Sequence, residues 1–67
     1  MKQYANMYEY LIGKLTEQVD DIESHLGRGQ VANIEEYRRL VGVIQGLNAA
    51  ISLIEDLQKR QEQDADE

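Results

Sequence analysis

The chain contains no cysteine, so disulfide bonds cannot stabilise it, and no Cys/His cluster offers a structural zinc site. Its 67 residues place it near the lower size limit for a domain that folds alone. At this size, the free energy gained by burying apolar surface roughly equals the conformational entropy lost on folding. We therefore expect association, with a second copy or with another protein, to supply the missing stability.

An excess of basic residues is also lacking. Seven Lys and Arg residues stand against 13 Asp and Glu residues, which gives a net charge of −6. Proteins that bind nucleic-acid backbones need clustered Lys and Arg, so we expect no direct contact with nucleic acid. Part of the excess of acidic residues is local, because residues 61–67 contain four of them. We predict that this segment is a flexible, acidic tail.

The sequence has no pattern typical of a signal peptide or of a membrane span. Residues 1–4 lack the basic segment and following apolar run of a signal peptide. No uninterrupted apolar stretch has the length required to span a bilayer. We expect a soluble protein that is intracellular when synthesised and has no membrane partner.

Proline is absent, and the five glycines are the only strong helix breakers. Gly27 and Gly29 fall close together, and apolar residues recur at helical spacing on both sides of them. Before them, this spacing predicts a helix over residues 3–26, with Gly27 as the left-handed residue that ends it. Its apolar positions are Met1, Ala5, Tyr8, Ile12, Leu15, Val19, Ile22 and Leu26.

After the glycines, Asn33 is a favourable N-cap, and Glu36 three residues later completes a capping-box pattern. A second helix is predicted over residues 34–60, following a turn over 27–33. Its apolar positions are Tyr37, Leu40, Ile44, Leu47, Ile51 and Ile54.

A turn this short makes the two helices antiparallel neighbours. The predicted fold is therefore all-α, a two-helix antiparallel hairpin over residues 1–60 that resembles a coiled coil and is completed by self-association or by a partner. The same arrangement brings two acids to the level of two arginines, which predicts ion pairs between the helices. The residues concerned are Asp20, Asp21, Arg38 and Arg39.

The second helix is apolar over more of its circumference than one partner helix covers. One interpretation is a generous core with some exposed aliphatic side chains; the other is docking on further helices, for instance in a homodimeric four-helix bundle. A stripe of Gly42, Gly46, Ala49 and Leu53 points away from the predicted core. Small residues at this spacing let a second backbone approach closely, by analogy with membrane helices. They are equally compatible with ordinary exposed positions or a helix bend.

The candidate interface therefore consists of this stripe with Val41 and Val43 beside it. Met7 and Tyr10 form a second exposed patch on the first helix, although two amphipathic side chains are often ordinary surface.

Catalytic constellations are missing. The single histidine, His25, has Asp21 one turn before it, which is at most half of a metal site. No serine lies in a nucleophile elbow, and no glycine-rich loop follows a strand. We expect no enzymatic activity, catalytic residue, metal, cofactor or small-molecule substrate.

Three segments carry a resemblance to known proteins: residues 8–15 (YEYLIGKL), residues 36–47 (EYRRLVGVIQGL) and residues 54–57 (IEDL). Together they resemble a group of small, acidic-tailed helical hairpins of tailed bacteriophages, encoded among the genes for head and tail assembly. The resemblance covers nearly the whole chain, and its motifs are helix-packing residues.

This resemblance implies a virion structural protein or assembly accessory, made in the host cytoplasm and then incorporated into or acting on the virion. The implied partners are a second copy of the chain and virion proteins such as capsid, portal or tail subunits. The alternative is a small acidic phage regulator that binds and inhibits a host protein. The net charge and the acidic tail motivate that alternative, because negative surface competes for basic clefts.

Overall fold

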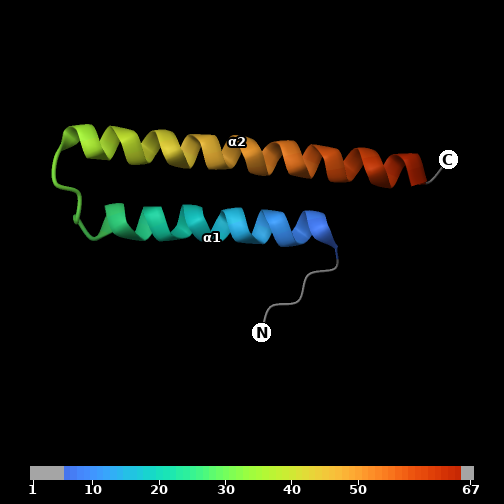
Figure 1. Ribbon diagram of the computed structural model, residues 1–67, viewed down its shortest axis with the longest axis horizontal. Coiled ribbons are helices and arrows are strands. Elements are labelled where there is room, and N and C mark those ends of the chain that lie inside the picture. The colour runs from blue at the N-terminus through green and yellow to red at the C-terminus, as the bar shows by residue number, and fades with distance from the viewer. Residues whose placement is uncertain (1–5, 66–67) are drawn as a thin grey trace.

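A computed structural model describes residues 6–65, with side chains described through residue 63, and contains two helices, α1 (Met7–Gly27) and α2 (Ile34–Ala65). They run antiparallel, with the turn at one end and the start of α1 and the end of α2 at the other (Figure 1). The predicted all-α hairpin is therefore confirmed. The predicted apolar positions Met1 and Ala5, and predicted helical residues 3–5, lie outside the described part of the chain.

The start of α1 is fixed by Asn6. Its backbone is extended, and its side-chain Oδ1 accepts a hydrogen bond from the backbone N–H of Glu9 at 2.9 Å. This contact satisfies one of the amide donors that every helix start leaves without an intrahelical partner.

At the end of α1, the glycine with the left-handed conformation is not the one that was predicted. Gly27 is still helical, and Gly29 carries the positive φ of 69°. The backbone N–H of Gly29 donates to the carbonyl of Leu26 at 3.1 Å, and that of Gln30 donates to the carbonyl of His25 at 3.4 Å. These two bonds form a Schellman motif, which requires the left-handed residue two positions later than expected.

The start of α2 lies where the sequence predicts it. The backbone N–H of Glu36 donates to Asn33 Oδ1 at 2.8 Å. The carboxylate of Glu36 reaches back and accepts from the backbone N–H of Ala32 at 3.2 Å. This is a capping box displaced by one residue from its usual form, in which the carboxylate bonds to the N–H of the cap residue itself.

The end of α2 is later than predicted. The helix continues through Ala65, so the backbone of residues 61–65 is helical where a flexible tail was expected. Figure 1 shows this end of α2 extending past the start of α1. Its last turns therefore have no neighbouring helix among residues 6–65.

The two helices form one layer rather than a closed core. The molecule measures 52 × 26 × 12 Å, and its thickness equals roughly one helix diameter of about 10–12 Å. Its radius of gyration is 15.3 Å, against about 11 Å for a compact domain of this length. Among the described residues, Val19 is the only buried one, with 7% of its surface exposed. A stable domain normally packs two layers around its core, so this layer lacks a cover.

The predicted ion pairs between the helices are wrong. Within residues 6–63, Asp20, Asp21, Arg38 and Arg39 form no ion pair. The helical repeat turns Asp21 and Arg38 toward opposite outer edges of the hairpin, although they lie at similar heights along it. Two ion pairs lie within single helices, between Lys14 and Glu17 at 3.8 Å and between Arg60 and Asp56 at 3.2 Å.

Candidate protein-interaction surface

Large apolar side chains remain exposed on both helices. In the described part of the chain they are Met7, Tyr10, Leu11, Ile34, Tyr37, Val43, Leu53 and Leu57. Two of them, Met7 and Leu53, have 74% and 71% of their surface exposed. An apolar surface of this kind on a small protein is typical of an interaction site.

Several of these side chains share one broad side of the hairpin. Positions three, four and seven residues apart lie on the same face of a helix. The inward direction is given by Val19 in α1 and by half-buried Ile44 and Ile51 in α2. Around each helix axis, the side chains about a quarter turn from this inward direction lie on the same broad side of the hairpin. We call this side the apolar face; it consists of Met7 and Leu11 from α1 and Val43, Ala50 and Leu57 from α2.

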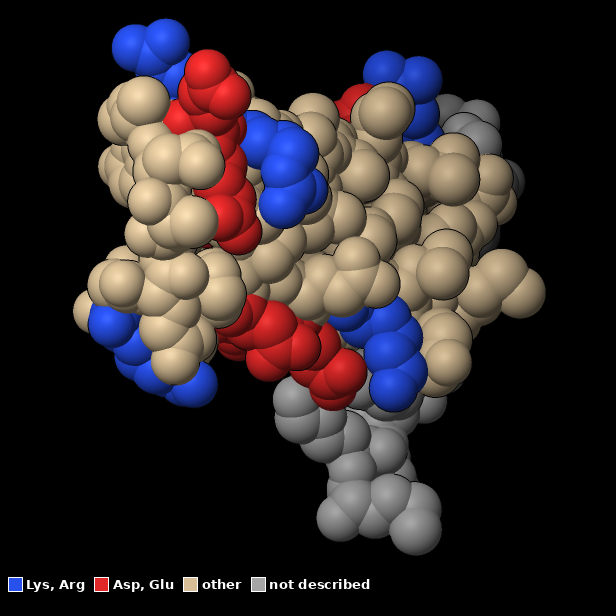
Figure 2. Space-filling view, turned by 60° about the vertical axis from the view of Figure 1, so that its left-hand side comes forward, with Lys and Arg blue, Asp and Glu red and all other residues tan. Residues whose placement is uncertain are grey.

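The opposite side of the hairpin carries more acidic residues but is not free of apolar ones. The same helical repeat assigns to it Glu9, Asp20 and Glu23 from α1 and Glu55 and Glu62 from α2, in one row with exposed Ile34 and half-buried Val41. From the direction of Figure 2, a broad area of uncharged side chains lies between groups of acidic and basic ones. The larger share of exposed apolar side chains on the apolar face favours the approach of an apolar partner surface from that side.

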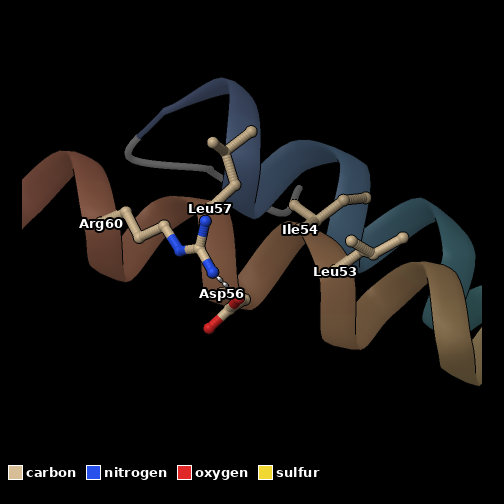
Figure 3. A pocket seen from close by; sticks show the side chains of 5 residues that line it. All are labelled: Leu53, Ile54, Asp56, Leu57 and Arg60. Atoms are coloured by element: carbon tan, nitrogen blue, oxygen red, sulfur yellow. Dashed lines mark ion pairs between the residues drawn. The ribbon is translucent and has the colours of Figure 1, made fainter.

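A shallow groove marks the C-terminal half of α2. It encloses about 300 Å³ and is lined by Leu53, Ile54, Asp56, Leu57 and Arg60. Figure 3 shows Leu53 and Leu57 beside the ion pair of Arg60 and Asp56. The two charged side chains are 74% and 58% exposed, so this pair contributes little to stability. It gives the groove a polar rim next to its apolar floor.

The predicted stripe is exposed along its whole length. Gly42, Gly46, Ala49 and Leu53 are all in contact with solvent. A Cβ atom added at Gly42 or Gly46 would meet no heavy atom within 4 Å. Packing within the hairpin therefore does not require glycine at either position.

The other predicted interface residues separate into different surfaces. Met7 and Val43 belong to the apolar face. Val41 is half-buried on the opposite flank of α2 and does not join them. Tyr10 lies on the outer side of α1, where Lys14 Nζ is 5.6 Å from the centre of its ring, a cation–π contact. The structure thus does not gather the predicted residues into one patch.

Leu11 and Leu57 belong to the apolar face, and the sequence analysis did not name them as interface candidates. They are 40% and 47% exposed. The available signal was the width of the apolar stripe, since one partner helix covers only a narrow seam.

The composition of α2 also meets a test for membrane spans. Among the described residues, Ile34–Gln63 is long and apolar enough to cross a membrane by length and composition, which the sequence analysis did not expect. The uncharged stretch at its centre, Leu40–Ile54, rises only about 22 Å along the axis, whereas the hydrocarbon core of a bilayer is about 30 Å thick. A helix that packs against neighbours on several sides has a similar composition.

His25 occupies the last turn of α1 and is half-buried. Within residues 6–65, no group of three or more His, Cys, Asp or Glu side chains could hold a metal ion. Comparison with models of known protein families, with curated protein sequences and with solved structures found no match to this chain.

Proposed function

We propose that the hairpin is a non-enzymatic protein–protein interaction module whose apolar face binds another protein during assembly of a phage virion. The binding role is inferred from the single layer of two helices, which has no second layer packed against it. One buried residue in the described chain, and a side that exposes Met7, Leu11, Val43 and Leu57, leave the hairpin incomplete until a partner covers it.

The virion setting comes from the resemblance to phage hairpin proteins. A repeated docking element for capsid, portal or tail subunits needs no pocket chemistry and no catalytic group. It needs a rigid apolar side that packs on a subunit and a charged side that stays solvated. The hairpin exposes an apolar face on one side and carries acidic residues on the other.

The test is association with particles. The chain would be produced together with phage head and tail proteins, and particles or assembly intermediates would be purified by gradient sedimentation. Quantitative mass spectrometry would then count copies of the chain per particle. We expect a fixed copy number for the wild type, and its loss in the double variant Leu11→Glu, Val43→Glu.

Glu23→Gln on the acidic side is the matched control and should keep the wild-type copy number. Circular dichroism of each purified variant separates lost binding from lost folding. Absence of the wild-type chain from both particles and intermediates would contradict the assembly role.

A further inference from the structure

The outer side of α2, away from α1, carries a second uncovered surface with a specific order of charges. Its residues follow one another at alternating intervals of four and three, so they share a single helix face. All of them are exposed. We call this the outer face; it consists of Glu35, Arg39, Gly42, Gly46, Ala49, Leu53, Asp56 and Arg60.

The outer face is complementary to itself when one copy is reversed. Each end carries an acid followed one turn later by an arginine, first Glu35 and Arg39, then Asp56 and Arg60. In an antiparallel pair of α2 helices, Glu35 lies opposite Arg60 of the second copy, and Arg39 lies opposite its Asp56. We propose that two copies of this chain associate through their outer faces, antiparallel, about a two-fold axis between Gly46 and Ala49.

The charges disfavour a parallel pair of α2 helices and the antiparallel registers shifted by one helical turn. A parallel pair places each charged residue opposite its own counterpart, so all of the opposed charges repel. Sliding the antiparallel pair by one turn in one direction places Arg39 opposite Arg60, and sliding it in the other places Glu35 opposite Asp56. Like charges held opposite each other are destabilising. The charges therefore specify one register, although each exposed pair adds little affinity.

In that register the uncharged centre also fits. Gly42 lies opposite Leu53 of the second copy, and Gly46 lies opposite its Ala49. The space beside both glycines is empty in the hairpin, and Leu53 is 71% exposed. A leucine side chain can occupy the space above a glycine of the facing helix, which lets the two backbones approach closely.

The exposed area agrees with a missing partner of this size. The chain exposes 5375 Å², against about 4,300 Å² for a compact monomer of the same mass. The excess of about 1,000 Å² exceeds the roughly 800 Å² that each partner contributes to a standard stable interface. An isologous dimer covers the same surface on both copies, which suits a face that is complementary to itself.

The first experiment is the solution mass by light scattering over a range of concentrations, with circular dichroism in parallel. We expect the wild type to reach twice the 7.7 kDa mass of one chain. Gly46→Leu should remain monomeric and helical, because the leucine has free space in the hairpin but blocks the close approach. Asn48→Leu is the matched control on another exposed side of α2 and should dimerise like the wild type. A monomeric wild type, or undiminished dimerisation of Gly46→Leu, overturns the proposal.

The second experiment tests the register. In Glu35→Arg, Arg39→Glu, all four charge pairs become repulsive, and we expect dimerisation to weaken about tenfold or more. Asp56→Arg, Arg60→Glu should behave in the same way. Combining all four substitutions in one chain restores opposite charges throughout and should restore the dimer. Continued weakness of the fourfold variant with normal helicity would overturn the antiparallel register.

This inference is independent of the virion role. The variants of the outer face leave Leu11 and Val43 unchanged, so binding of an assembly partner to the apolar face can be measured separately. The two proposals can therefore fail one at a time.

Discussion

Asn33 is the single residue on which the start of α2 most depends, because its side chain accepts the 2.8 Å hydrogen bond from the N–H of Glu36. We expect Asn33→Ala to lower the free energy of unfolding by about 1 kcal/mol, the usual cost of losing an N-cap. Urea unfolding followed by circular dichroism would measure it. Asn48→Ala, an exposed position within the same helix, is the control and should be neutral or slightly stabilising. Equal stability of Asn33→Ala and wild type would contradict the capping role.

Gly27 and Gly29 allow a second comparison at the scale of single residues. Gly29 has φ of +69°, so Gly29→Ala should destabilise the hairpin by about 1 kcal/mol. Gly27 lies in the last helical position with nothing within 4 Å of an added Cβ. Gly27→Ala should therefore stabilise it by up to about 1 kcal/mol, since alanine favours the helix. Thermal unfolding at equal concentrations would show the opposite shifts; the reverse order would contradict the Schellman geometry.

At the scale of the helices, the sequence predicted the start of α2 and missed its end. The start depends on one local hydrogen bond, which the spacing of Asn33 and Glu36 predicts. The end at Ala65 has no such signal, because nothing in residues 61–65 is a strong breaker. The choice between Gly27 and Gly29 could not be made either, since composition alone makes the two glycines equivalent.

One candidate surface was predicted from the sequence and the other was not, and the difference lies in how each depends on the packing of the helices. The stripe containing Gly42 and Gly46 depends on spacing within one helix, and the structure leaves it exposed as expected. The apolar face depends on how far each helix is rotated toward the other. Spacing along one helix does not determine that rotation, which is why Leu11 and Leu57 were not predicted as interface residues.

The end of α2 beyond the start of α1 supports a prediction about the acidic segment. Deleting residues 61–67 removes the last helical residues, 61–65, which have no neighbouring helix in the described part of the chain (Figure 1), so the ellipticity lost should match the deleted residues alone. Binding to an assembly partner through the apolar face should be unchanged in a titration by isothermal calorimetry. Loss of binding on deletion would instead support the acidic regulator that inhibits a host protein.

For the whole molecule, a single layer of two helices is only marginally stable alone, and association couples its folding to concentration. We therefore expect the Tm of the wild type to rise as the chain concentration is raised a hundredfold, because the proposed dimer would stabilise the folded state by mass action. In Gly46→Leu the Tm should be independent of concentration, even though leucine raises local helix propensity over glycine. Differential scanning calorimetry of the two proteins across the same range makes the comparison. A concentration-independent Tm in the wild type would show that two helices suffice without a second copy, and the uncovered layer would then have to be stabilised within the hairpin by its capped ends and by the seam around Val19.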